Sequence, residues 1–153
     1  MSKIIVRRAR IDDIEFMTDE LILFSHEYGT RKSLIGSSEK CRSRLPWLIE
    51  NHVVFVAFKE DTTKIGFIAG IGHPHLFNPE IKVLGEVFFW VCEEYRGSRA
   101  GLLLLRAFIA EGEKNYDWVT MATIGDNSRL KPETLEKQGF VKKETGFLLE
   151  VRK

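Results

Sequence analysis

The sequence predicts one α/β domain of mixed α+β character, in which a mixed central sheet of about seven strands carries helices on both faces. Three observations support this fold class. Runs rich in Ile, Val and Phe end at polar turns, amphipathic stretches with helical spacing lie between them, and one strand–helix–strand unit requires a parallel pair. The expected order of elements over residues 1–153 is βααβββαβαββ.

The composition fits a single globular domain. The 153 residues are 44% hydrophobic and 29% charged, which suffices for a sizeable core. With 23 basic and 22 acidic side chains the formal net charge is +1, so no bulk attraction to nucleic acid or to an anionic membrane is expected. Two cysteines without metal-site spacing, no signal peptide and no long apolar run predict a cytoplasmic protein without a metal.

The first third of the chain is expected to form one strand and two helices. Residues 3–9, rich in Ile and Val, predict the strand. Asp12 and Glu15 have capping-box spacing ahead of apolar residues that recur every three or four positions. The second helix is expected over 38–51, where Pro46 predicts a break or bend.

The rest of the chain alternates strands and helices. Strands are expected over 53–59, 65–73, 83–93, 118–124, 140–143 and 147–152, and helices over 98–114 and 132–138. The third and fourth of these strands are joined through a helix and are therefore expected to be parallel. Pro132 suits the first turn of the last helix and Gly139 its end, after which the last two strands are expected to close a hairpin.

The most informative stretch lies between the predicted strand 83–93 and the helix that follows it. It reads Arg96-Gly97-Ser98-Arg99-Ala100-Gly101, and such small residues let backbone amides approach an anion closely. The helix N-terminus adds unpaired N–H groups and the positive end of the helix dipole. The two arginines offer charge-assisted bonds to a diphosphate. Taken alone, the stretch fits equally well an ordinary turn with two solvated arginines.

In its place among the elements, this loop resembles the Gln/Arg-x-x-Gly-x-Gly/Ala loop of the GCN5-related N-acetyltransferase (GNAT) superfamily. Arg96 fills the first position and Gly101 the last, while Arg99 stands where a middle glycine is usual. Asn127, followed by Leu-Glu-Lys-Gln-Gly-Phe at 135–140, resembles the family's Asn…Tyr-Glu-Lys-x-Gly-Phe ending. The loop is also similar to that of small acetyltransferases encoded by bacteriophages, which implies a location in the host cytoplasm.

The resemblance implies direct transfer of an acetyl group from acetyl-CoA to an amine, without a metal. The CoA diphosphate would lie on the loop formed by Arg96, Gly97, Ser98, Arg99, Ala100 and Gly101. Asn127 would hydrogen-bond the pantetheine arm, and a backbone N–H near Val91 would polarise the thioester carbonyl. The acceptor amine, whether a small molecule, a lysine or a protein N-terminus, is not specified.

Glu86 is the candidate catalytic base. It is a carboxylate inside an apolar strand, where burial raises the pKa toward neutrality. Such a group can accept the proton that an alkyl ammonium loses before it attacks. In the histone-acetylating branch of the family a glutamate sits similarly on this strand. The alternative is that Glu86 faces solvent or pairs with a basic side chain.

Two departures from the family pattern favour a second hypothesis, a non-catalytic acyl-CoA-binding module. Leu135 stands where many members carry a tyrosine that protonates the departing thiolate, and Arg99 replaces the middle glycine. A third hypothesis is a phage–host interaction or nucleic-acid-directed protein that uses the basic residues Arg31, Lys32, Lys40, Arg42 and Arg44. The alternative for that cluster is a solvated helix face. No membrane partner is expected, and the sequence is compatible with a homodimer.

Overall fold

Four antiparallel strands and one parallel strand form the single sheet of this protein, in the order β1-β2-β3-β4-β5. The computed structural model describes residues 3–124 and 129–151. The strands are β1 (Ile4–Arg8), β2 (Val53–Lys59), β3 (Lys64–Pro74), β4 (Lys82–Val91) and β5 (Trp118–Thr120). The helices are α1 (Ile14–Tyr28), α2 (Ser38–Asn51), α3 (Ala100–Asn115) and α4 (Pro132–Lys137), with 3-10 turns η1 (Ile11–Asp13) and η2 (Glu93–Tyr95). No helix within the two described ranges is long and apolar enough to cross a membrane.

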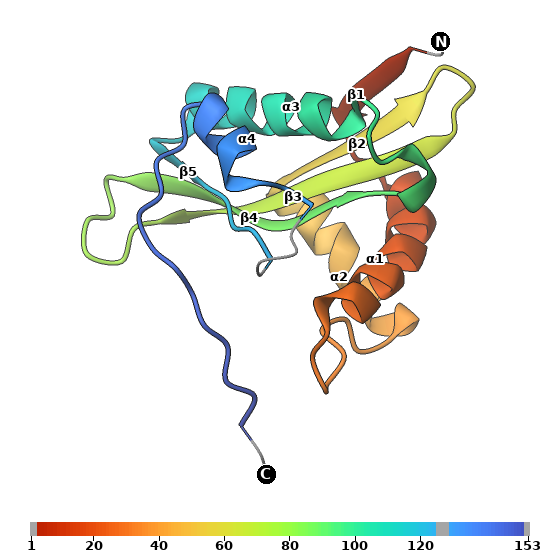
Figure 1. Ribbon diagram of the computed structural model, residues 1–153, viewed down its shortest axis with the longest axis horizontal. Coiled ribbons are helices and arrows are strands. Elements are labelled where there is room, and N and C mark those ends of the chain that lie inside the picture. Colours follow the sequence, from red (N-terminus) through yellow and green to blue (C-terminus); the bar gives the residue numbers. More distant parts are fainter. Residues whose placement is uncertain (1–2, 125–128, 152–153) are drawn as a thin grey trace.

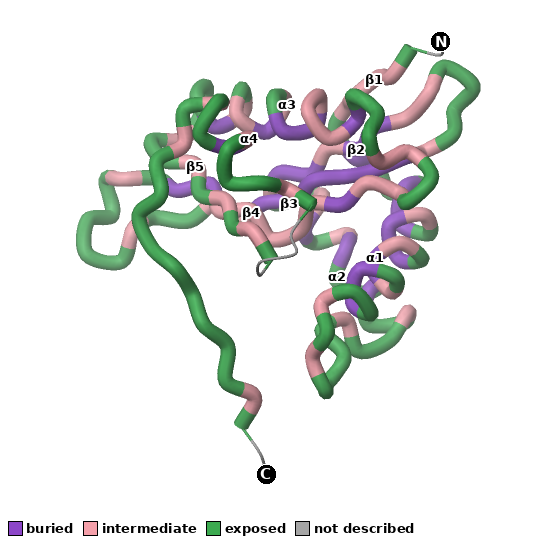
Figure 2. The backbone as a smooth tube through the Cα atoms, in the orientation of Figure 1, coloured by how far each residue is buried: buried purple, intermediate pink, exposed green. Residues whose placement is uncertain are grey.

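Helices cover both faces of the sheet, as predicted (Figure 1). Side chains alternate along a strand, so Phe67 packs in the cluster beneath α1 and α2 while its neighbour Ile68 packs beneath α3. Met17 of α1 and Phe108 of α3 are fully buried anchors of the two clusters. Figure 2 shows the buried residues gathered along the sheet and the inner sides of these helices. The mixed α+β sandwich expected from the sequence is thus confirmed.

A buried carboxylate fixes the first helix to the sheet. Asp13 is fully buried and accepts a two-pronged bond from Arg7 of β1, at 2.7 and 3.1 Å. Its Oδ1 also lies 2.8 Å from Lys64 Nζ, and its Oδ2 accepts the Arg10 backbone N–H at 2.7 Å. Asp13, rather than the predicted Asp12, therefore provides the side-chain bond at the start of the helical segment.

A β-bulge in β4 bends this strand away from its parallel neighbour. Ala69 of β3 faces Phe88, whereas the next residue, Gly70, faces Glu86, so Val87 is an extra residue in β4. β5 pairs with β4 only from Val83 to Gly85. From Glu86 onward the two strands separate, and no strand in residues 3–124 and 129–151 pairs with the edge of β4 on that side.

The sheet has five strands in the described residues, so the prediction of about seven strands in the order βααβββαβαββ is wrong in its last part. The predicted strands 140–143 and 147–152 do not form a hairpin through residue 151, because this stretch runs away from the sheet and finds no strand to pair with (Figure 1). The predicted strand 118–124 is reduced to Trp118–Thr120, because the bulge carries β4 out of reach beyond Gly85. α2 continues through Pro46 as one helix.

Candidate active site

The separation of β4 from β5 leaves one edge of β4 open beyond Gly85 in the described residues, and the space along this open edge is called the cleft below. Cys92 donates its N–H to Ile65 of β3 at 2.9 Å, so strand alternation turns the N–H and C=O of Val91 toward the open edge. In agreement, the Val91 carbonyl accepts a bond from Arg96 Nε at 2.8 Å, outside the sheet ladder. The Val91 N–H faces the same edge and can donate to a group lying in the cleft.

The loop after β4 ends at the N-terminus of α3 with several free N–H groups. Gly97 adopts φ +90°, a left-handed conformation that favours glycine, and a Cβ at Gly97 would meet open space. Ser98 donates its N–H to the Tyr95 carbonyl, and its Oγ accepts the Ala100 N–H at 3.2 Å. No acceptor among the described residues pairs with the N–H groups of Gly97, Arg99, Gly101 and Leu102. They form a cluster of donors at the positive end of a 16-residue helix.

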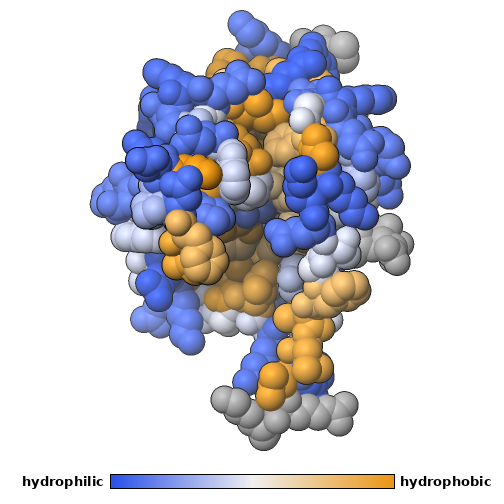
Figure 3. Space-filling model, turned by 90° about the vertical axis from the view of Figure 1, so that its left-hand side faces the viewer, coloured by the Kyte–Doolittle hydropathy of each residue, from blue (hydrophilic) through white to orange (hydrophobic). Residues whose placement is uncertain are grey.

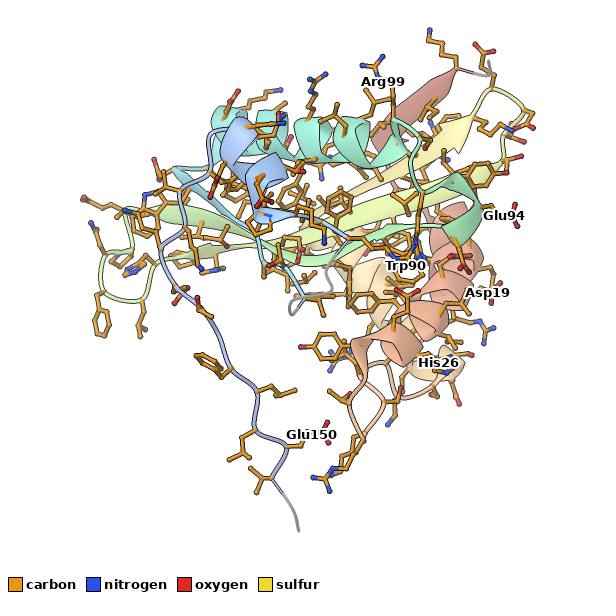
Figure 4. The ribbon with its side chains drawn as sticks, in the orientation of Figure 1. Asp19, His26, Trp90, Glu94, Arg99 and Glu150 are labelled. Carbon is orange, nitrogen blue, oxygen red and sulfur yellow. The ribbon has the colours of Figure 1, made fainter. Side chains whose placement is uncertain are left out.

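The two loop arginines have different surroundings. The Arg96 side chain is only 14% exposed: besides its bond to Val91, it lies 4.3 Å from the centre of the Trp90 ring and donates to Glu27 at 3.2 Å. Arg96 therefore has a structural role: its side chain connects the loop to β4 and to α1. Arg99 is exposed, has no ion pair among the described residues and points away from the body of the protein (Figure 4). Of the two arginines predicted to bind an anion, Arg99 is therefore the one whose charge can pair with a ligand.

Glu86 lies where β4 leaves β5, one residue past the last pair between Gly85 and Thr120. Its register partner Gly70 packs against the Phe108 ring, which occupies the place of a side chain, so Glu86 is set among apolar groups on the α3 side of the sheet. Burial raises the pKa of Glu86 to about 7. No hydrogen bond or ion pair to Glu86 occurs within residues 3–124 and 129–151. The alternative of a carboxylate paired with a base finds no support in the described contacts.

Two more side chains lie beside the neighbouring residue of β4, on the face of the sheet opposite to Glu86. The Gly85 position is flanked by Thr120 Oγ1 and by Nε2 of His73. His73 Nδ1 lies 3.0 Å from the Pro74 carbonyl oxygen, which can only accept, so the neutral ring donates from Nδ1 and keeps Nε2 as its acceptor nitrogen. The register of β3 against β4 brings His73 here, and sequence spacing does not reveal it.

Cys92 directly follows β4, and its surroundings disfavour the thiolate form of its side chain. Burial raises the pKa of its thiol to about 12, with a further contribution from the neighbouring Glu20 carboxylate and its hydrogen bond. Glu20 also accepts the Trp90 indole N–H at 2.6 Å. A thiol with so high a pKa carries almost no thiolate near neutral pH.

The connection between α1 and α2 contacts the C-terminal segment. We define this segment as residues 141–151. Arg31 donates through its backbone N–H and Nε to the Glu150 carboxylate, at 2.8 and 3.2 Å. Arg42 is paired with Glu15 at 2.7 Å. Two of the five residues in the predicted basic cluster are thus neutralised by carboxylates, which weakens it as an anion-binding surface.

The remaining predicted site residues are placed as follows. Leu135 is buried in α4 and presents no acid at the position of the family tyrosine. Asn127 lies outside the described residues. Within those residues no group of three or more His, Cys, Asp or Glu side chains can hold a metal ion.

Two cavities of about 280 and 430 Å³ lie apart from the loop, the first lined by His52, His73 and Tyr116 and the second by His26 and several serines.

Comparison with known proteins agrees with this geometry. The profile of the Acetyltransferase (GNAT) family matches residues 18–140, more than half of the chain. The protein therefore belongs to the GNAT family of acetyltransferases. No curated protein matches the sequence.

Solved structures show the same fold at low sequence identity. An acetyltransferase of Trypanosoma brucei superposes with a TM-score of 0.73 at 16% identity, covering 97% of this chain and 100% of that one. Glucosamine-6-phosphate N-acetyltransferase from Arabidopsis thaliana gives 0.73 at 14% identity, covering 98% and 99%. A predicted acetyltransferase from Clostridium acetobutylicum, solved with acetyl-CoA, gives 0.71 at 20% identity, covering 97% and 96%. At these identities the similarity establishes the fold.

Proposed function

We propose that this protein is an N-acetyltransferase that moves the acetyl group of acetyl-CoA to a primary amine by direct attack. One observation carries the proposal: β4 leaves β5 at Glu86, and its free edge leads from that carboxylate to the donor cluster at the start of α3. The edge of one strand therefore connects the proposed anion site at the start of α3 to the proposed proton acceptor, Glu86. The bound acetyl-CoA of the Clostridium relative supports the choice of co-substrate.

In the proposed complex, the CoA diphosphate accepts hydrogen bonds from the N–H groups of Gly97, Arg99 and Gly101, and the Arg99 guanidinium adds an opposite charge. The pantetheine arm extends along the open edge of β4, where it takes the place of a neighbouring strand. The Val91 N–H is then a donor at that edge for the thioester carbonyl.

The chemistry asks for one proton acceptor and one proton donor. The amine nitrogen attacks the thioester carbon, the carbon–sulfur bond breaks, and the Glu86 carboxylate takes the proton that the amine loses. A base with a pKa of about 7 is largely ionised just above neutral pH and still basic enough to accept that proton. The departing thiolate takes its proton from solvent, because Leu135 supplies none.

A specific observation favours the second candidate, an acyl-CoA-binding module without turnover. Beyond the apolar Leu135, all three tyrosines of the chain are engaged in packing. The Tyr28 ring packs at a tilt against Phe24, Lys59 Nζ lies over the Tyr95 ring, and Tyr116 fills the space above Gly72. None of the three lies on α4, where the resemblance to the family places the acid.

The experiment measures binding and turnover separately. Calorimetric titration with CoA is expected to show binding, and binding lost in Gly101→Asp would locate it at the loop, since a carboxylate there repels the diphosphate. Release of free thiol from acetyl-CoA with a panel of small amines, lysine peptides and N-terminal peptides then tests turnover. CoA binding without thiol release on any acceptor supports the binding module, and absence of CoA binding rules out both candidates.

A further inference from the structure

A small pocket lies at the end of the sheet where the connection between β3 and β4 projects (Figure 1). It has a volume of about 280 Å³, and its walls come from the end of α2, the end of β3, the start of β4 and the residue after α3. This end of the molecule faces the viewer in Figure 3, where hydrophilic side chains predominate. The loop proposed to bind CoA lies at the opposite end of α3 and contributes no residue to the pocket.

His52 offers the pocket a hydrogen-bond donor. Its Nδ1 accepts the backbone N–H of Gly72 at 3.1 Å, so the neutral ring carries its proton on Nε2. The Trp47 ring packs edge-on against the imidazole, with 4.6 Å between the ring centres, and restrains its orientation. No acceptor in the described part of the chain pairs with the Nε2–H. His52 lines the pocket, and this N–H is therefore free to bind a ligand.

The Tyr116 hydroxyl is a second donor beside the same glycine. A Cβ at Gly72 would lie 2.5 Å from Tyr116 Oη, so only glycine leaves room for the hydroxyl here. Within residues 3–124 and 129–151 the hydroxyl makes no hydrogen bond. His52 and Tyr116 therefore bring two unused donors to one short stretch of β3.

Lys82 supplies the positive charge. It lines the pocket, is exposed and has no ion pair among the described residues. Its backbone is fixed at both ends, because its N–H donates to the Asp117 carboxylate and its C=O accepts the Asp117 N–H, each at 2.8 Å. Neither Asp117 nor the exposed Glu80 lines the pocket, and none of the lining residues is acidic.

We propose that this pocket binds a small anion that carries phosphate or carboxylate oxygens. Such oxygens accept hydrogen bonds from His52 Nε2, the Tyr116 hydroxyl and the Lys82 ammonium, and the last of these bonds is charge-assisted. The volume lies just below the range of about 300–1,000 Å³ that holds drug-sized molecules, so the ligand is small. The proposal is independent of acetyl transfer, because it uses neither Glu86 nor the loop at the start of α3.

Nuclear magnetic resonance of the ¹⁵N-labelled chain tests the pocket directly. Inorganic phosphate and succinate are titrated separately at neutral pH, with sodium chloride adjusted to keep the ionic strength constant. The Gly72 amide and the His52 Nε2–H are expected to shift and to saturate with at least one of the two anions. The anion that saturates distinguishes a phosphate from a carboxylate ligand. If neither signal saturates with either anion, the proposal is overturned.

Two substitutions each remove one ligand group and keep the fold contacts. Lys82→Gln retains both backbone bonds to Asp117, and His52→Asn places an amide oxygen where Nδ1 accepts the Gly72 N–H. Each is expected to weaken anion affinity by about 10-fold or more, the loss that follows removal of a hydrogen bond to a charged group. The matched control is Lys137→Gln, an exposed lysine of α4 outside the pocket, with unchanged affinity. Wild-type affinity in Lys82→Gln overturns the proposal.

Thermal unfolding separates this pocket from the loop at the start of α3, which also attracts phosphate. The saturating anion is expected to raise the unfolding temperature of the wild type, because it binds the folded chain. This increase is expected to persist in Gly101→Asp, whose carboxylate repels anions from the loop, and to be reduced in Lys82→Gln. An increase that is lost in Gly101→Asp and kept in Lys82→Gln would assign the anion to the loop and overturn the proposal.

Discussion

The loop at the start of α3 and the C-terminal segment differ in how many contacts hold them to the rest of the fold. Arg96 is almost buried and makes three contacts, with strand, aromatic ring and helix, and backbone bonds fix the turn beside it. The C-terminal segment is held by one exposed pair, Arg31 with Glu150. Several contacts therefore hold the loop proposed to bind CoA, whereas a single ion pair holds the C-terminal segment, so we expect local unfolding to cost less in the segment than in the loop.

The largest effect is expected at the point where the cleft begins. Glu86→Gln removes the proposed base and is expected to lower kcat/KM by about 100- to 10,000-fold while CoA affinity is unchanged. In the wild type, kcat/KM is expected to rise with pH up to about 7 and then level off, because the base acts in its ionised form. Thiol release across pH measures both, with the exposed Glu94→Gln as the matched control. An unchanged rate in Glu86→Gln would remove the base assignment.

The same substitution is expected to stabilise the fold. Because burial raises the pKa of Glu86 to about 7, ionising this group costs free energy in the folded state. The cost is absent well below pH 4.5, grows between pH 4.5 and about 7, and levels off above that at on the order of 3 kcal/mol. Thermal unfolding at pH 8 is therefore expected at a higher temperature for Glu86→Gln, and equal unfolding temperatures at pH 4 provide the internal control. A lower temperature at pH 8 would contradict the burial of an unpaired carboxylate.

Arg96→Ala tests how firmly the loop at the start of α3 is held. Loss of the bonds to Val91 and Glu27 and of the contact with Trp90 is expected to cost about 2–4 kcal/mol of unfolding free energy and to weaken CoA binding. Urea unfolding and calorimetry measure the two effects. Arg106→Ala, on the exposed side of α3, is the control and is expected to change neither. A cost below about 1 kcal/mol would mean that the loop is held by its backbone alone.

The scaffold beneath both regions is expected to respond to acid. Burial alone would raise the pKa of Asp13, but hydrogen bonds from Arg7, Lys64 and the Arg10 N–H lower it to about 2. The network therefore contributes about 2 kcal/mol at neutral pH, which is lost as pH falls from about 4 through 2. Asp13→Asn is expected to flatten this part of the stability curve, whereas Asp12→Asn at the exposed neighbour leaves it in place.

The smallest effect is expected at the C-terminal segment. Glu150→Ala breaks an exposed pair and is expected to change the unfolding free energy by less than about 1 kcal/mol. Salt is expected to reduce even this difference. Urea unfolding at low and high ionic strength measures it, with Glu144→Ala, exposed and unpaired among the described residues, as the control. A cost as large as that of Arg96→Ala would abolish the contrast between the two regions.

Much of the fold follows from local patterns. The amphipathic spacing of α1 and α3 and the apolar runs of β2, β3 and β4 place these elements within a few residues of the predicted bounds. The closing hairpin was predicted wrongly for a physical reason. Its residues have the composition of strands, but a strand forms only where a partner edge is in reach, and composition does not state where that edge lies.

The candidate site divides in the same way. The small residues of 97–101 and the apolar surroundings of Glu86 are visible in the sequence, because local chemistry dictates a turn in one case and a costly charge in the other. The position of His73 beside Gly85 is not visible, since it depends on the register of two strands. The sequence also does not show that Arg96 is held within the fold while Arg99 is left unpaired in the described residues. This difference depends on the contacts of Arg96 with Trp90 and Glu27.

The sequence by itself determined the layered α+β architecture, the loop that begins α3 and the carboxylate in β4, because each depends on residues that are neighbours in the chain. Only the tertiary structure decided where β4 parts from β5, which arginine of the loop is free and where the C-terminal segment goes. These depend on a single extra residue, Val87, and on contacts between distant parts of the chain. Such contacts form only when the whole domain has folded, so no local sequence pattern predicts them.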